Sequence, residues 1–158
     1  MIRDVLLHPH PLLTRKAAET DAATAARVIQ DLLDTMRAFG HCVGIAAPQI
    51  GESVRVAVVD VTGHRKATTS HGELVLVNPV IVDSSGSEVG REGCLSIPEL
   101  TANVRRATHV TVEAEGLQIE AEGFEARALQ HEIDHLDGLL FLDRVESLEA
   151  DVFRRTRR

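Results

Sequence analysis

Two histidines, His131 and His135, stand four residues apart with Glu132 between them. On an α-helix this spacing places both imidazoles on one face, one turn apart, whereas Glu132 points about 100° away. The two rings can then bind one metal ion, and the carboxylate can accept a proton from a water on that ion without binding the ion itself. This His-Glu-x-x-His pattern is typical of zinc hydrolases. The ordinary alternative is a polar helix face with two solvated histidines.

A third ligand would favour the metal site, since catalytic zinc-type sites usually hold three protein ligands and leave one position for water. The three-histidine protease pattern requires a ligand at position 141, which is Phe141, and the short segment after His135 leaves no room for the other protease version. Upstream, Cys94 lies within Glu-Gly-Cys-Leu-Ser at residues 92–96. A thiolate is a good ligand for Fe(II), Zn, Ni or Co. A buried apolar cysteine is the alternative.

Residues 43–51, Val-Gly-Ile-Ala-Ala-Pro-Gln-Ile-Gly, form a third segment of interest. They follow a predicted helix and precede an apolar strand, and their small side chains permit close approach of another backbone. The Gln49 amide could donate a hydrogen bond to a developing oxyanion. The alternative is a tight helix-to-strand connection with a surface glutamine.

Taken together, the three segments resemble the peptide deformylase family. Gly-x-Gly-x-Ala-Ala-x-Gln, Glu-Gly-Cys-Leu-Ser and Gln-His-Glu-x-Asp-His occur there in this order, and here they stand at residues 42–49, 92–96 and 130–135. The likeness includes residues 8–13 and continues to about Arg144. It implies an α+β fold in which small antiparallel sheets pack around a central metal-binding helix.

The resemblance also implies a reaction, the metal-dependent removal of an N-formyl group with release of formate. It implies one divalent ion, Fe(II) first and Zn, Ni or Co as replacements, held by Cys94, His131 and His135. Glu132 would act as general base on a metal-bound water. Gln49 and the backbone N–H of Leu95 would stabilise the oxyanion, a contribution typically worth about 3 kcal/mol per donor.

The implied substrate is an N-formyl-methionyl nascent peptide. The backbone at Val43, Gly44 and Gly93 would pair with the main chain of this extended peptide, as in strand addition. Such pairing depends on few side chains of the peptide, so substrate specificity would rest on the pocket for the first side chain.

One departure from the family pattern concerns the metal centre. Cys42 replaces the usual first glycine, which places a second thiol in the neighbourhood. Three charged residues are candidates for supporting roles at the site. Glu92 could orient local groups, and Asp134 or Arg106 could support the metal helix. A solvated surface charge is the favoured interpretation for each.

Hydrophobic periodicity predicts the elements that must position these residues. Helices are expected over residues 21–39 and 124–137, and polar loops over residues 62–72 and 83–90. Strands are expected over residues 54–61, 74–82, 109–114 and 117–121, the last two joined by a hairpin turn at Glu115 and Gly116. Because the strands cluster between the two helices, an α+β fold with antiparallel pairing is favoured.

Length and composition agree with one metal-hydrolase domain over residues 1–158, of which residues 145–158 form a helix or a tail. The chain has 158 residues, 44% of them hydrophobic, and a net charge of -7, which argues against nucleic-acid binding and specific DNA binding. No segment reads as a signal peptide or a membrane span, and two cysteines suit a reducing compartment, so a cytoplasmic location is expected.

Other interpretations remain open. The basic residues 154–158 make the ribosome a candidate partner. The alternatives for this segment are a helix end whose positive charges complement the helix dipole, or a disordered tail. The same site could serve another N-formyl or N-acyl small molecule, or an inactive metal-binding relative with a partner-binding role. Intact Glu132 argues against the inactive relative, because a pure binding site needs no general base.

Overall fold

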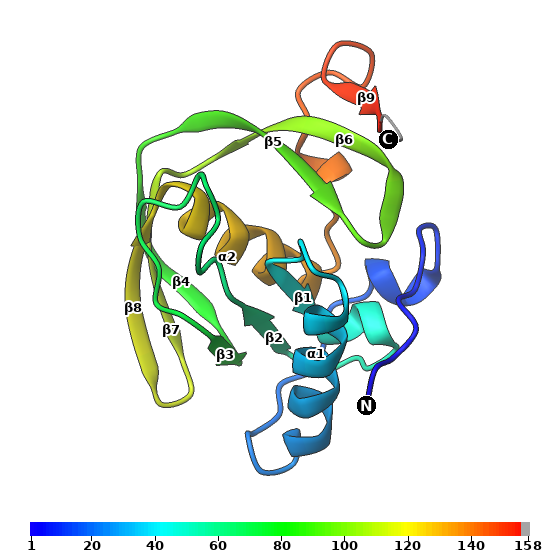
Figure 1. Ribbon diagram of the computed structural model, residues 1–158, viewed down its shortest axis with the longest axis vertical. Coiled ribbons are helices and arrows are strands. Elements are labelled where there is room, and N and C mark those ends of the chain that lie inside the picture. The colour runs from blue at the N-terminus through cyan, green and yellow to red at the C-terminus, as the bar shows by residue number, and fades with distance from the viewer. Residues whose placement is uncertain (156–158) are drawn as a thin grey trace.

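The computed structural model describes residues 1–155 of the chain (Figure 1). These residues form two α-helices, α1 (Ala26–Ala38) and α2 (Gly123–Leu136), and three short 3-10 helices, η1 (Pro11–Thr14), η2 (Ala47–Ile50) and η3 (Phe141–Arg144). They also form nine strands, namely β1 (Gly44–Ala46), β2 (Val56–Val59), β3 (Leu74–Val77), β4 (Val80–Ser85), β5 (Glu88–Cys94), β6 (Ile97–Arg106), β7 (His109–Ala114), β8 (Leu117–Glu122) and β9 (Val152–Arg154).

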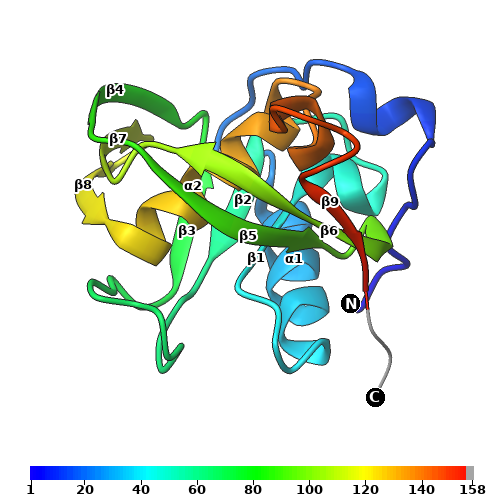
Figure 2. The same cartoon turned by 90° about the horizontal axis from the view of Figure 1, so that it is seen from above.

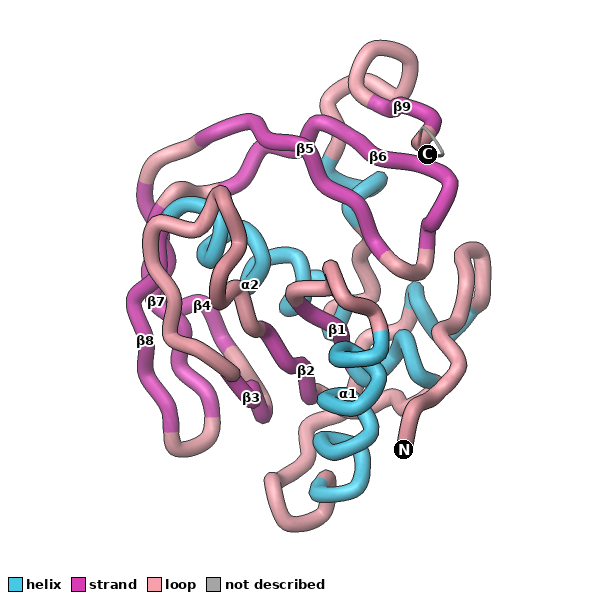
Figure 3. The backbone as a smooth tube through the Cα atoms, viewed as in Figure 1, coloured by secondary structure: helices cyan, strands magenta, loops and turns pink. Residues whose placement is uncertain are grey.

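Within the described residues, the strands form three sheets of three strands each, in the orders β1-β2-β3, β4-β7-β8 and β5-β6-β9. Every pairing between these strands is antiparallel. Figures 1 and 3 show the sheets standing around α2, with the long β5-β6 hairpin passing over the helix. The predicted α+β fold of small antiparallel sheets around a central helix is confirmed.

Helix α2 is buried along most of its length, including both histidines. It packs against β1, β2 and β8, and Leu129 and Leu136, both fully buried, belong to the main hydrophobic core. The helix ends before Gly138, which has a φ of +78° that favours glycine. A side chain there would also meet the Thr14 carbonyl oxygen at 2.7 Å, so the chain leaves the helix against the N-terminal segment.

Helix α1 packs its apolar face on β1 and β2 and closes a second core that includes Leu32 and Ile45. It begins at Ala26, five residues later than residues 21–39 predict. The reason is local, because the Asp21 carboxylate accepts hydrogen bonds from the backbone and the hydroxyl of Thr24. These bonds favour a turn in place of the first helical turn.

The predicted loop over residues 83–90 is wrong, because residues 83–85 end β4 and residues 88–90 begin β5. Both strands expose most of their side chains, so they lack the alternating apolar pattern that predicts a strand. Their ladders of backbone hydrogen bonds hold them instead. The predicted strand over residues 74–82 is divided at Asn78, whose φ is +53°. The hairpin at Glu115 and Gly116 is confirmed.

The described end of the chain is a strand, where a helix or a tail was predicted. β9 pairs with β6, placing Phe153 opposite Thr101. Figure 2 shows this strand lying along the β5-β6 hairpin. Residues 156–158 of the basic segment lie outside the described residues. No helix among residues 1–155 has the length and apolar character needed to cross a membrane.

Candidate metal centre and the groove beside it

Cys94, His131 and His135 come together although they lie on different elements. Cys94 ends β5, both histidines project from α2, and one ligand atom from each lies within 4.8 Å of the others. The distance from Cys94 Sγ to His135 Nε2 is 3.4 Å. Tetrahedral bonds to one zinc-type ion would put sulfur and nitrogen about 3.5 Å apart. The donors therefore fit a single divalent ion with one position left open.

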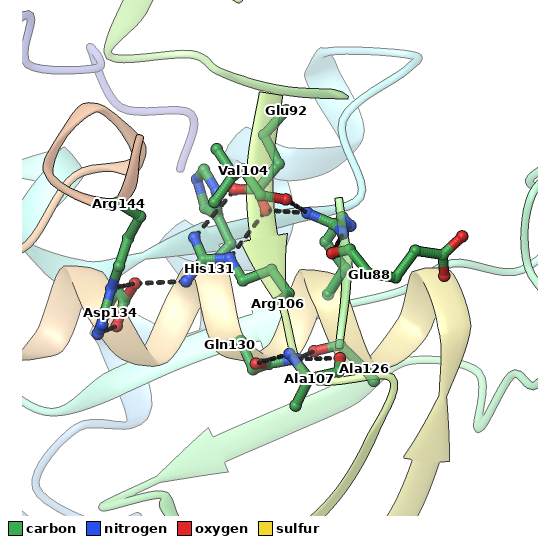
Figure 4. A network of polar contacts seen from close by, with 11 residues as sticks. Glu88, Glu92, Val104, Arg106, Ala107, Ala126, Gln130, His131, Asp134 and Arg144 are labelled. Atoms are coloured by element: carbon green, nitrogen blue, oxygen red, sulfur yellow. Dashed lines mark hydrogen bonds and ion pairs between the residues drawn. The ribbon is translucent and has the colours of Figure 1, made fainter. Parts of the chain in front are cut away.

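The second nitrogen of His131 has a buried partner, Glu92. His131 Nδ1 lies 2.8 Å from Glu92 Oε1, which leaves Nε2 for a metal. Arg106 donates two further hydrogen bonds to this carboxylate, at 2.8 and 2.9 Å. Burial opposes ionisation of Glu92, but the hydrogen bonds from Arg106 and His131 outweigh it and lower its pKa. Glu92 is thus a buried anion that orients a metal-site histidine (Figure 4).

Arg106 also reaches the metal helix. It donates to Asp134 at 2.5 Å, and Arg144 donates to the same carboxylate at 2.8 and 3.0 Å. Burial disfavours the charged form of Asp134, yet the two arginines lower its pKa. Figure 4 shows this network joining α2 to the strand above it. Glu92, Arg106 and Asp134 are all buried, so interpreting them as solvated surface charges is wrong.

Glu132 lies one residue from His131 and points into a buried space. Its side chain is 4% exposed, and its Oε1 has no hydrogen-bond partner among residues 1–155. Burial raises the pKa of this carboxyl, although the two neighbouring histidines oppose the shift. The backbone of Gly44 passes close by, because a methyl group on Gly44 would lie 2.7 Å from Glu132 Oε2. The absence of a side chain at Gly44 therefore provides the space that the Glu132 carboxylate occupies.

Gln49 is fixed at both ends of its amide. Its Oε1 accepts a hydrogen bond from the Ala46 backbone at 3.0 Å, and its Nε2 donates to Ser96 Oγ at 3.1 Å. The same Nε2 lies 3.5 Å from Cys94 Sγ. Gln49 is therefore a buried residue of the metal centre, and the alternative of a surface glutamine is wrong. Nothing in the sequence indicates its contact with Ser96.

A groove of about 510 Å³ opens beside these residues. β1 and β5, which are edge strands of their sheets within the described residues, both contribute to its walls. Its lining includes every residue predicted to bind substrate or oxyanion, namely Val43, Gly44, Gln49, Gly93 and Leu95. It also includes Phe124 and Arg127, which the sequence did not mark as site residues, and Arg155, which the sequence marked only as part of a basic segment at the end of the chain. No motif connects these three, because they belong to α2 and the end of the chain.

Cys42 lies at the groove but outside the metal-binding group. Its Sγ donates to the Gly44 carbonyl at 3.1 Å. Burial raises the pKa of this thiol to about 12. By contrast, burial opposes ionisation of Cys94, but His135 and His131 hold the pKa of that thiol well below its usual range. The two thiols therefore differ, and only Cys94 favours the thiolate form that a metal requires.

Phe141, which occupies the position of a third histidine ligand in some proteases, has a packing role. It is 1% exposed and belongs to the third hydrophobic core with Leu13 and Val104. Its ring stacks on His131 at a centroid distance of 6.2 Å. Cys94 from β5 supplies the third potential ligand instead, and it packs against the same core.

Comparison with known proteins agrees with this geometry. A family model described as polypeptide deformylase matches residues 2–151. The chain is 42% identical to peptide deformylase 2 of Vibrio cholerae, over 96% of this chain and 90% of that protein. It is 41% identical to a peptide deformylase of Syntrophobacter fumaroxidans, over 98% and 92%. A crystal structure of a peptide deformylase from Legionella pneumophila superimposes with a TM-score of 0.83 at 39% identity, covering 94% of this chain and 89% of that one.

Proposed function

The chain belongs to the polypeptide deformylase family, and we propose that it hydrolyses the N-formyl group of nascent peptides that begin with formyl-methionine, releasing formate and a free N-terminus. The observation that carries this proposal is the convergence of Cys94, His131 and His135 beside the buried carboxylate of Glu132. A metal-dependent amide hydrolase needs a metal site with an open position and a base next to it.

The proposed ligands are Cys94 Sγ, His131 Nε2 and one ring nitrogen of His135. A bound divalent ion would acidify a coordinated water and polarise the formyl carbonyl. We propose Fe(II) as the ion in the cell, with Zn, Ni or Co as replacements, since one thiolate and two imidazoles suit each of them. Glu92 holds the His131 ring in place and keeps Nδ1 protonated, which makes Nε2 the ligand.

Glu132 is proposed to accept the proton of the attacking water and to return it to the leaving amine. Burial raises its pKa, which makes the carboxylate a stronger base than that of an exposed glutamate. Gln49 and the Leu95 backbone N–H are proposed to donate to the oxyanion. The amide of Gln49 is already oriented by Ala46 and Ser96, so little reorganisation is needed.

The substrate is proposed to bind as an extended strand between β1 and β5. Val43, Gly44 and Gly93 would pair with its main chain, because both strands have an unpaired edge at the groove. The first side chain would enter the part of the groove lined by Phe124 and Ala128. Main-chain pairing explains how one enzyme can serve many different sequences.

The decisive experiment is formate release from an N-formyl-Met peptide by anaerobically purified protein whose metal content has been measured. We expect release by the wild type, and a loss of about 10²- to 10⁴-fold in Glu132→Ala with the metal retained. Glu132→Gln is the matched isosteric variant and should be equally impaired. A metal-loaded wild type that releases no formate would contradict the proposal. The same assay with N-formyl and N-acyl small molecules tests the second candidate substrate class.

We further propose that the protein works in the cytoplasm at the ribosome, because its proposed substrate is a chain under synthesis. The basic end of the chain is the proposed contact, and its described part, Arg154 and Arg155, is exposed. Salt-sensitive cosedimentation with ribosomes tests the contact. Ribosome binding that is unchanged after removal of residues 156–158 and neutralisation of both Arg154 and Arg155 would rule out this segment.

A further inference from the structure

Three arginines line the groove, and their partners distinguish them. Arg127 donates to Glu92 Oε2 at 2.8 Å and to the carbonyl oxygens of Val104 and Glu88 at 2.7 and 2.9 Å. These three acceptors fix Arg127 as part of the wall. It has little capacity left for a ligand.

Arg91 is also held within the protein. It donates to Asn103 at 3.1 Å and to Thr101 at 3.3 Å, and its guanidinium lies 3.9 Å from the centre of the Phe153 ring. This cation-π contact fastens β9 to β5 across the intervening strand β6. The role of Arg91 is therefore to hold the C-terminal strand in place.

Arg155 follows that strand directly. Its backbone N–H donates to the Glu99 carbonyl at 2.8 Å, which continues the pairing with β6. Its guanidinium lies against the backbone of Gly93, since a methyl group on Gly93 would lie 2.2 Å from Arg155 Nη2. No hydrogen bond or ion pair joins this guanidinium to another side chain of residues 1–155. An exposed cation thus stands over Gly93 of β5, the strand along which the peptide is proposed to pair.

We propose that Arg155 is a specificity-determining residue that binds a carboxylate of the peptide downstream of the formyl-methionine. The carboxylate belongs either to an acidic side chain or to the C-terminus of a short peptide. An arginine reaches about 7 Å, and an extended strand advances about 3.4 Å per residue, so the first residues after the methionine are within range. A planar guanidinium suits a carboxylate because it can donate two parallel hydrogen bonds.

This inference rests on the proposed function, and five peptides test it. Two neutral amidated peptides, formyl-Met-Ala-Gln and formyl-Met-Gln-Ala, are compared with their acidic counterparts, amidated formyl-Met-Ala-Glu and formyl-Met-Glu-Ala. The fifth peptide is formyl-Met-Ala-Gln with a free C-terminus. We expect the wild type to show kcat/KM values about two- to fivefold higher for a carboxylate-bearing peptide than for its neutral counterpart at low salt, because the ion pair is exposed. Added salt should reduce the difference.

Arg155→Ala should abolish the preference and leave the neutral peptides within twofold of wild type. Arg155→Lys should keep part of the preference. Arg154→Ala is the matched control, because Arg154 is an exposed neighbour on β9 that does not line the groove, and it should behave as wild type.

An unchanged preference in Arg155→Ala, or an equal loss on all peptides, would overturn the inference, since the second result indicates only a structural role for β9. A wild type that shows no preference for a carboxylate would also overturn the inference, but it would leave the proposed function intact. If no peptide released formate, the proposed function itself would fail and the inference with it. Formate release from the neutral peptides thus distinguishes a failure of this inference from a failure of the proposed function.

Discussion

Gly44 is a position of the groove at which a single methyl group would collide with Glu132. The added carbon would lie 2.7 Å from Glu132 Oε2. We expect Gly44→Ala to displace the carboxylate and lower kcat by about 10²-fold, since a displacement near 1 Å has this effect on a reacting group. Metal content should stay unchanged. Formate release and metal analysis on the same sample measure both.

Gly40→Ala is the matched control for this variant, because a methyl group on Gly40 would meet nothing within 4 Å. It should keep wild-type activity. Equal activity of Gly44→Ala and wild type would show that the position of Glu132 does not limit the reaction.

Cys42 provides a second test at the residue scale. Its thiol is half-buried beside Gly44, where burial raises its pKa to about 12, and it is thus protonated at neutral pH. We expect Cys42→Gly to leave metal content and activity unchanged, and iodoacetamide to modify Cys42 slowly in the metal-loaded protein at pH 8. Peptide mass mapping reads the modification. A large gain of activity in Cys42→Gly would instead show that the thiol disturbs the site.

At this scale the metal ligands could be predicted, because residue type and spacing determine the chemistry of a His-Glu-x-x-His helix. The partners of those ligands could not. Glu92 lies 39 positions from His131 and 14 from Arg106, and only the fold shows that they meet in a buried network. A charged residue in a sequence is usually solvated, so its burial cannot be predicted before its partners are known.

At the scale of elements, Arg106 is the residue that joins β6 to both β5 and α2. Its side chain is 4% exposed and pairs with Glu92 and Asp134. Removing it takes one cationic partner from each of two buried carboxylates, which keep only Arg127 and His131 at Glu92 and Arg144 at Asp134. We expect Arg106→Ala to lower the free energy of unfolding by about 3–5 kcal/mol. Urea unfolding of the metal-free protein measures this loss.

The neighbouring Arg105 is the matched control. Its pair with Glu146 is exposed, and Arg105→Ala should cost at most about 1 kcal/mol. Similar losses in the two variants would mean that the buried network contributes no more than a surface pair.

The same network predicts how stability depends on pH. The pKa values of Glu92 and Asp134 are lowered in the folded protein and lie near 4 in the unfolded chain. Their contribution is therefore complete above about pH 4 and is lost as the pH falls through the folded-state values. We expect the difference in unfolding free energy between wild type and Arg106→Ala to narrow below about pH 4. A difference that stays constant from pH 7 to pH 3 would contradict this assignment.

Elements with strong periodicity, namely α2, β7 and β8, could be predicted from the sequence to within a residue or two. β5 could not, although it carries Cys94. It exposes most of its side chains and contains two glycines, so its pairing with β6 is its main source of order. A strand of this kind has no signal in its own residues.

For the whole molecule, we propose that residues 1–158 form one domain that the metal helps to hold together. The ligands come from two elements, β5 and α2, and the ion binds only when both are in place. We expect a single calorimetric transition for the metal-loaded protein, and a lower Tm after chelation that is restored by adding the metal back.

Cys94→Ala supplies the control for this prediction, because its Tm should no longer respond to the chelator. Two separate transitions in the wild type would contradict the single domain. An equal effect of the chelator on Cys94→Ala would place the stabilising ion elsewhere.

The unpaired edges of β1 and β5 have a consequence for timing. A groove that pairs with main chain accepts only a chain whose own backbone groups are still free. A formylated N-terminus that has entered a helix or a sheet no longer offers these groups. If the proposed function holds, the time available for deformylation of each new protein is therefore limited by how soon its first residues fold. Chains with early-folding N-termini should keep their formyl group most often when the enzyme is scarce.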